Sequence, residues 1–151
     1  MNYLVTGGAG FIGSYIAKKL LNLGHKITII DNLSTGYTTN LPSEAKFIEG
    51  DVSKSETIKK LNDFKFDAIL HIAGQSSGEV SFENPVIDLN SNVTSTLLLL
   101  DYAYKTNCTK FIYASSVSVY GEQLGKEQFS ETDDPNPKSF YAVGKLASEH
   151  Y

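Results

Sequence analysis

The sequence predicts an α/β protein with a parallel sheet that is covered by helices on both faces. Short apolar or β-branched runs alternate with segments of helical spacing, and a glycine-rich turn directly follows the first run. Strands separated by helices pair as parallel neighbours. Ligands of such sheets bind beyond the carboxyl ends of the strands, so we expect the functional residues at that edge.

The first strand–helix–strand unit is the clearest part of the pattern. Residues 4–6 are a short apolar run, and residues 11–23 carry apolar side chains at helical spacing. Gly24 ends this helix, and the β-branched run 26–30 follows as the second strand. This unit predicts two adjacent strands joined by a helix that crosses one face of the sheet.

The same alternation continues toward the end of the chain. Further strands are expected at 46–49, 68–71 and 111–114, and further helices at 55–62, at 88–104 and from about residue 140. The polar segment 122–139 contains two prolines and is expected to be a long functional or mobile loop.

Composition restricts the class of partner. The chain has 151 residues with 41% hydrophobic content, which predicts one domain over residues 1–151. Its net charge of -4 and the lack of a basic block argue against a nucleic-acid partner. The longest apolar stretch is far shorter than the roughly 20 residues that cross a bilayer. Cys108 is the only cysteine and no basic leader begins the chain, so we expect a cytoplasmic protein that binds a small molecule.

A glycine-rich turn links the first strand to the first helix. Gly7, Gly10 and Gly13 give this segment a tight turn and a backbone that a ligand can approach closely. The free N–H groups and the dipole of the helix N-terminus attract an anion. A plain structural turn is the alternative, but the pattern favours a pyrophosphate site in a Rossmann-like, doubly wound sheet.

An acidic residue at the end of the second strand supports a dinucleotide as the ligand. Asp31 lies 18 residues after Gly13, near the offset of about 20 expected for a carboxylate that binds the adenosine ribose. A carboxylate there would repel a 2′-phosphate, which favours NAD over NADP. Asp51 and Val52 follow the third strand and are candidates for adenine contacts, although Asp51 can equally cap the next turn.

Tyr141 and Lys145 are four residues apart and lie on one face of the last expected helix. A phenol has an ordinary pKa of about 10, and a nearby ammonium favours the phenolate, so Tyr141 is a candidate general acid and base. A half-buried ring beside a solvated lysine is the ordinary alternative. Ser115 and Ser116 strengthen the catalytic interpretation, because they leave the carboxyl end of a strand where substrate would bind.

Taken in order, these motifs resemble the NAD-dependent epimerase/dehydratase family, in particular its UDP-sugar 4-epimerases. The resemblance extends over essentially the whole chain. It rests on residues 6–13, 31–36, 51–52, 71–74, Asn92, 115–121 and 141–145.

The resemblance implies a reaction and a role for three residues. A nucleotide sugar, expected to be a UDP-sugar, is transiently oxidised at C4 to a 4-keto intermediate and then reduced on its other face. Tyr141 is the implied acid and base, Lys145 orients the nicotinamide ribose and lowers the pKa of Tyr141, and Ser116 holds the sugar oxygen.

The resemblance also implies a set of NAD-binding residues and no metal site. Together with Tyr141 and Lys145, these residues are Gly7, Gly10, Phe11, Ile12, Gly13, Asp31, Asn32, Leu33, Ser34, Thr35, Gly36, Asp51, Val52, Ile72, Ala73, Gly74 and Asn92.

Three places in the sequence, with five residues, refine the resemblance. Val117 and Ser118 stand where family members that dehydrate the sugar have an Asp-Glu pair, which disfavours a dehydratase. Gln75 and Ser76 follow the His71–Gly74 motif, where several epimerases have a lysine near the pyrophosphate. His71 is expected to be a core residue rather than a catalytic one.

Members of this family continue beyond the tyrosine-bearing helix into a smaller domain that binds the sugar nucleotide. We therefore expect this chain to be the cofactor-binding part of a longer enzyme, inactive alone and lacking the C-terminal substrate domain. A homodimer is expected through residues 88–104 and the tyrosine-bearing helix. The alternatives are a dehydratase, decarboxylase or 4-keto reductase of the same family, or a non-catalytic NAD sensor, which would not need Ser116, Tyr141 and Lys145 together.

Overall fold

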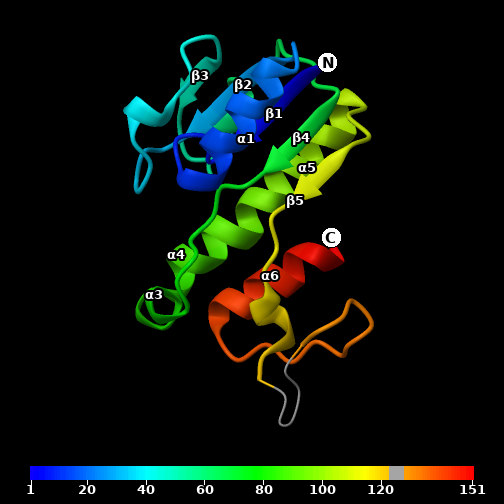
Figure 1. Cartoon of the computed structure of the whole chain (residues 1–151). Coiled ribbons are helices and arrows are strands. Elements are labelled where there is room, and N and C mark those ends of the chain that lie inside the picture. The colour runs from blue at the N-terminus through cyan, green and yellow to red at the C-terminus, as the bar shows by residue number, and fades with distance from the viewer. Residues whose placement is uncertain (123–127) are drawn as a thin grey trace.

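The computed structural model describes residues 1–122 and 128–151, and its centre is a five-stranded parallel sheet (Figure 1). The strand order is β3-β2-β1-β4-β5. The strands are β1 (Asn2–Thr6), β2 (Lys26–Asp31), β3 (Lys46–Glu49), β4 (Ala68–His71) and β5 (Phe111–Tyr113). The chain moves outward from β1 through β2 to β3 and then returns to the other side of β1. The direction in which strands are added therefore reverses between β1 and β4, which is the topological switch point of the sheet. The predicted fold class is confirmed.

Helices of three types connect and follow the strands. The α-helices are α1 (Phe11–Asn22), α2 (Ser55–Lys59), α3 (Gly78–Glu83), α4 (Pro85–Leu89), α5 (Ser95–Thr106) and α6 (Phe140–His150). Two short 3-10 turns are η1 (Thr38–Asn40) and η3 (Val117–Tyr120), and η2 (Asn90–Thr94) is a π-helical turn.

Alternating side chains of the strands form two apolar cores. On one face, Leu4 and Ile69 pack with Leu99 and Tyr102 of α5. On the other face, Val5 and its strand neighbours pack with the apolar stripe of α1. Helix α6 packs against α3, α4 and η2 rather than on the sheet, and Figure 1 shows it beyond the ends of the strands.

The long helix differs from its predicted extent. We expected a helix at 88–104, whereas helical structure starts at Pro85 and continues through η2 to Thr106. Proline is compatible with the first turn of a helix, because the N–H that it lacks has no partner there. In the π-helical turn, the carbonyl of Asn92 accepts hydrogen bonds from the hydroxyls of Thr96 (2.7 Å) and Ser148 (2.9 Å). These side-chain hydroxyls thus supply hydrogen bonds to a carbonyl where the backbone departs from the regular α-helical pattern.

Other boundaries shift by a few residues. Helix α1 ends one residue earlier than predicted, α2 ends at Lys59 instead of residue 62, and β5 ends at Tyr113 instead of Ala114. Helix α3 was not predicted, because it is short and has no clear apolar period. Its first turn is capped by Ser77, whose side chain accepts a hydrogen bond from the Val80 amide at 3.3 Å. Part of the predicted loop 122–139, residues 123–127, lies outside the described residues.

His71 is a fully buried side chain at the end of β4 and joins β1 to α5. Its Nδ1 lies 2.7 Å from Thr6 Oγ1, and its Nε2 lies 3.1 Å from Ser95 Oγ. Thr6 Oγ1 already accepts the amides of Ile72 and Ala73 at 3.2 and 3.1 Å, so its own proton points to Nδ1.

This order of donors assigns the imidazole proton of His71 to Nε2. The hydroxyl of Ser95 donates onward to the carbonyl of Ser91 at 2.6 Å, which leaves it free to accept from Nε2. Burial, with a smaller contribution from the charge of Lys145, lowers the pKa of His71 to about 3. Neutral His71 thus connects β1 to α5 through hydrogen bonds in the core, as expected for a core residue rather than a catalytic one.

We expect the free energy of unfolding to fall in acid because of His71. Its pKa in the folded state, about 3, lies below the unfolded value of about 6.5, so the unfolded chain binds the proton first. This contribution is fully present above pH 6.5 and is lost as the pH falls toward 3. The loss between pH 7 and pH 5 is about 2 kcal/mol. Urea unfolding at several pH values measures it.

The control for this experiment compares two histidine variants. His71→Gln removes the titrating group and should flatten the pH dependence, whereas His150→Gln removes an exposed imidazole and should leave it unchanged. An equally steep pH dependence in His71→Gln and in the parent protein would contradict the assignment to His71.

Candidate cofactor-binding and active site

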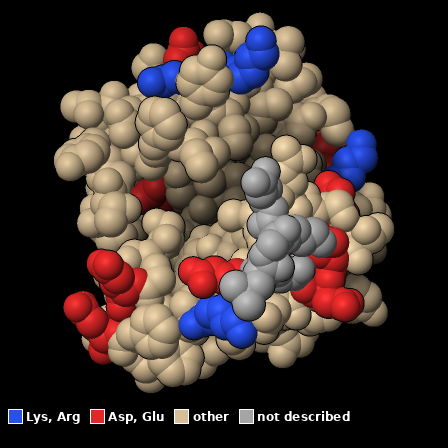
Figure 2. Space-filling view, turned by 60° about the horizontal axis from the view of Figure 1, so that its bottom comes forward, with Lys and Arg blue, Asp and Glu red and all other residues tan. Residues whose placement is uncertain are grey.

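A cavity of about 510 Å³ lies at the carboxyl edge of the sheet. Figure 2 looks toward this edge and shows a hollow surrounded mostly by uncharged residues. The residues that line the cavity are Gly7, Ile30, Asp31, Asn32, Ser34, Thr35, Gly50, Asp51, Val52, Ile72, Ala73, Gly74, Gln75, Ser76, Ser77, Val80, Ile87 and Ser91.

Ten of the nineteen predicted dinucleotide residues line this cavity. Gly10, Phe11, Ile12 and Gly13 form the end of the glycine turn and the start of α1. Leu33 and Gly36 belong to the loop after β2. Asn92 is fully buried in η2, and its side-chain oxygen points at the space beside Gly74.

The shape of the turn between β1 and α1 requires glycine at positions 7 and 13. Gly7 has a φ of +69°, and a Cβ there would lie 2.7 Å from the backbone nitrogen of Ala73. A Cβ on Gly13 would lie 2.2 Å from the carbonyl oxygen of Gly7. Helix α1 therefore begins directly against the turn, and its first turn contains no acidic residue. These features fit a bound pyrophosphate.

Asp31 supports the turn as well as lining the cavity. Its Oδ2 accepts a hydrogen bond from the Ala9 amide at 2.9 Å, and its Oδ1 accepts one from the Leu33 amide at 2.8 Å. Each carboxylate oxygen can accept a second hydrogen bond, which leaves capacity for ribose hydroxyls. Leu33 has a left-handed backbone with φ of +57°. The carboxylate therefore stabilises a sharply bent loop beside the cavity.

Two further predicted side chains follow β3 at the edge of the cavity. Asp51 Oδ1 accepts the amide of Ser53 at 2.9 Å, so the turn-capping alternative describes one role of this residue. Both Asp51 and Val52 still line the cavity. Asn40 was not predicted, yet its side chain donates to the carbonyl of Ala9 at 2.8 Å and ties η1 to the glycine turn.

Lys145 belongs to α6, and its side chain is buried next to the end of β5, with 5% of its surface exposed. Ser139 caps the start of α6 and the helix brings Lys145 beside Tyr141, with Nζ 5.7 Å from the tyrosine ring centre. Nζ donates to the carbonyl of Ala114 at 2.9 Å and lies 4.8 Å from the ring centre of Tyr113. Burial lowers the pKa of Lys145 to about 8, and the negative charge of Asp88 opposes this effect.

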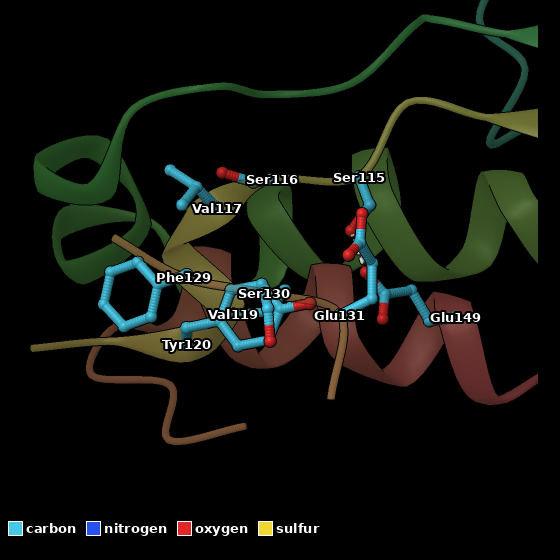
Figure 3. A pocket seen from close by; sticks show the side chains of 9 residues that line it. All are labelled: Ser115, Ser116, Val117, Val119, Tyr120, Phe129, Ser130, Glu131 and Glu149. Carbon is cyan, nitrogen blue, oxygen red and sulfur yellow. Dashed lines mark hydrogen bonds between the residues drawn. The ribbon is translucent and has the colours of Figure 1, made fainter. Parts of the chain in front are cut away.

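Ser116 lines a second, smaller cavity of about 260 Å³ that is drawn in Figure 3. Its Oγ donates to Ser118 Oγ at 3.1 Å and accepts the Ser118 amide at 3.2 Å. The neighbouring Ser115 donates to Glu149, and Figure 3 shows its side chain directed toward that carboxylate. Within the described part of the chain, no hydrogen bond joins Ser116 to Tyr141.

Sequence reasoning missed one wall of the larger cavity. This wall is formed by the segment 75–77 with Val80, Ile87 and Ser91. Gln75 is turned inward, where its Nε2 donates to the carbonyl of Ser77 at 2.7 Å and to Asp88 Oδ1 at 2.8 Å. The pattern Ser77-Gly78-Glu79-Val80 was an available signal, since serine is a preferred helix N-cap.

A doubly wound sheet, a glycine turn at its switch-point edge and an acid at the end of β2 define a protein of the dinucleotide-binding α/β class. Residues 3–151 match the model of the NAD dependent epimerase/dehydratase family. The chain belongs to this family, which confirms the resemblance inferred from its motifs and the expectation of NAD as the family's cofactor.

Curated relatives carry the names of sugar-nucleotide epimerases. A putative UDP-glucose 4-epimerase of Methanocaldococcus jannaschii is 38% identical over 149 residues, which cover 98% of this chain and 48% of the relative. The UDP-glucose 4-epimerase of Mycolicibacterium smegmatis is 38% identical, with coverage of 100% of this chain and 50% of the relative. The chain thus spans about half the length of these relatives.

Solved structures agree with the fold. UDP-glucose 4-epimerase of Thermotoga maritima with UDP-glucose has a TM-score of 0.96 and 36% identity, covering 100% of this chain and 50% of that chain. UDP-glucose 4-epimerase of Thermus thermophilus in complex with NAD has a TM-score of 0.94 and 40% identity. The match covers 100% of this chain and 49% of that chain. Among the residues described here, no helix is long and apolar enough to cross a membrane.

We expect Gly13→Ala to weaken NAD binding at least tenfold and to lower the melting temperature. The added methyl group would lie 2.2 Å from the Gly7 carbonyl, so the start of α1 must move away from the turn. Isothermal titration with NAD and a thermal melt measure the two effects. The matched control is Gly78→Ala, where the added methyl group would meet the Ser139 hydroxyl oxygen at 4.0 Å. NAD affinity unchanged in Gly13→Ala would contradict the proposed anion site.

Proposed function

We propose that this chain forms the NAD-binding part of a nucleotide-sugar 4-epimerase whose substrate is a UDP-sugar. The observation that carries the proposal is the buried Lys145, fixed by the Ala114 carbonyl beside Tyr141 at the end of β5. A structural lysine would keep its ammonium in water, whereas this one is desolvated beside a phenol at the ligand-binding edge of the sheet. The names of the relatives support the same reaction.

Tyr141 is the proposed general acid and base. Its phenolate would take the proton of the sugar 4-hydroxyl and return it to the same oxygen after the ring has turned. The ammonium of Lys145 would stabilise the phenolate electrostatically and donate to the nicotinamide ribose. Ser116 would hold the sugar oxygen, after its hydroxyl turns from Ser118 toward the substrate.

NAD, when bound, supplies the hydride acceptor and donor at C4. The glycine turn and the N-terminus of α1 would hold its pyrophosphate, with Phe11 and Ile12 at the rim. Asp31 would accept the adenosine ribose hydroxyls, and Asp51 with Val52 would contact the adenine. Gly74 provides space beside Asn92 and Lys145, which suits the nicotinamide end.

Within the family, epimerisation is favoured over dehydration by the side chains after Ser116. Val117 and Ser118 supply no acid that could protonate a leaving hydroxyl. The solved structure with UDP-glucose supports a UDP-sugar as the substrate class. We also propose a homodimer in the cytoplasm, formed through α5 and α6, where Leu97, Tyr104 and Val143 leave apolar surface exposed.

The activity is tested with purified protein that includes any residues flanking this chain in its native polypeptide. Incubation with NAD and UDP-glucose or UDP-galactose should interconvert the C4 epimers without net NADH. Tyr141→Phe should lower kcat by a factor of about 10² to 10⁴, since it removes the general acid and base. Tyr15→Phe, which changes an exposed ring of α1, is the control. Accumulation of NADH, or a deoxygenated or decarboxylated sugar, would contradict the epimerase proposal.

Asp31→Ser should reduce the preference for NAD over NADP by at least tenfold. The carboxylate repels a 2′-phosphate, and serine removes that charge. The ratio of the two dissociation constants is the measurement, because loss of the Ala9 and Leu33 hydrogen bonds weakens both cofactors. Asp63→Ser, at an exposed position, should keep the original ratio. A ratio that stays constant in Asp31→Ser would assign cofactor preference to other residues.

A further inference from the structure

Asp88 is an acid with 1% of its surface exposed, on the short helix α4. Burial of an ionised carboxylate is costly unless hydrogen bonds and an opposite charge compensate for the lost water. Its Oδ1 accepts two amide hydrogen bonds, from Gln75 Nε2 at 2.8 Å and from Asn92 Nδ2 at 3.1 Å. Two neutral amides therefore hold the carboxylate in one orientation, and they do not neutralise its negative charge.

The other carboxylate oxygen, Oδ2, faces helix α6 at Gly144, which precedes Lys145 in the sequence. A Cβ built on Gly144 would lie 3.4 Å from Oδ2, so α4 and α6 are in close contact here. Burial raises the pKa of Asp88 and the charge of Lys145 opposes that change. Conversely, burial lowers the pKa of Lys145 and the charge of Asp88 opposes that change. Each charge thus favours the ionised form of the other.

The amides that hold Asp88 are themselves fixed. Gln75 is held by Ser77 through its Nε2 and its Oε1, and Asn92 Nδ2 also donates to the carbonyl of Gln75 at 3.1 Å. Because Gln75 uses its polar atoms internally, it does not replace the pyrophosphate-binding lysine of related epimerases. It instead orients a buried negative charge toward α6.

We propose that Asp88 is a positioning residue, whose buried carboxylate, oriented by Gln75 and Asn92, keeps the Lys145 ammonium charged where the Ala114 carbonyl fixes it beside Tyr141. This inference rests on the proposed function, in which Lys145 serves the reaction. A purely structural Asp88 would stabilise the packing of α4 on α6 without affecting the ionisation of Lys145.

Other titratable groups near Lys145 come from three elements. Tyr141 and Glu149 belong to α6, Tyr113 belongs to β5, and His71 ends β4. His71 is neutral over the relevant pH range, and burial raises the pKa of Tyr113, so neither carries a charge near pH 8. Asp88 is the carboxylate whose charge acts against the burial of Lys145.

The test measures the titration of Lys145 in the protein without cofactor or substrate. Lysine labelled with ¹³C at Cε gives a resonance for Lys145, assigned by its loss in Lys145→Met. In Asp88→Asn, which keeps the shape of the side chain, the midpoint should fall by about one pH unit. In Asp101→Asn, which removes an exposed partner of Lys105, it should stay unchanged.

A reciprocal measurement keeps the proposal testable if Asp88→Asn fails to fold. Coupling between two sites is mutual, so Lys145→Met should raise the titration midpoint of Asp88, followed by ¹³Cγ of labelled aspartate. An unchanged midpoint of Lys145 in folded Asp88→Asn, or of Asp88 in folded Lys145→Met, would overturn the proposal. Neither result depends on catalytic activity, so failure of the epimerase proposal would be seen separately.

Discussion

Three backbone segments meet where β1 ends, and they approach too closely for side chains to lie between them. Gly7 touches the backbone of Ala73, Gly13 touches the carbonyl of Gly7, and Gly8 packs on the side chain of Ile29. The end of β1, the start of α1 and the segment after β4 are thereby held together. The cavity, the loop after β2 and the hydrogen bonds of Thr6 and His71 all depend on this contact.

The residues around this contact combine support of the fold with surfaces for a ligand. Asp31 holds two backbone amides and still faces the cavity. Gln75 and Asn92 organise the opposite wall while binding Asp88. Local stability and the shape of the cavity are therefore coupled at these positions, so a substitution there alters both. By contrast, Phe11 and Ile12 at the start of α1 are mostly exposed and contribute little to the core.

The sequence sufficed for features that are encoded locally. The β-branched runs and the glycine turn predicted the sheet and directed attention to its carboxyl edge, where the cavity lies, and the helical pattern from about residue 140 predicted α6. The buried role of Asp88 could not be predicted, because a lone aspartate near the expected start of a helix is typical of an exposed residue of the first turn. Its burial arises from α6, whose residues are more than fifty positions later in the chain. Gln75 departs from the family pattern in the sequence, but its inward orientation depends on contacts with Ser77 and Asp88 that the sequence does not reveal.

The π-helical turn η2 sets the rotational phase between the two halves of the long helix. One extra residue in a helical turn rotates the following segment by about 100° relative to a regular α-helix. With this offset, α5 directs Leu99 and Tyr102 toward the sheet while α4 directs Asp88 toward α6. A regular helix of the same sequence could satisfy only one of these interfaces. A point substitution near η2 changes one contact. Deletion of a single residue there would instead rotate a whole helical face away from the surface on which it packs.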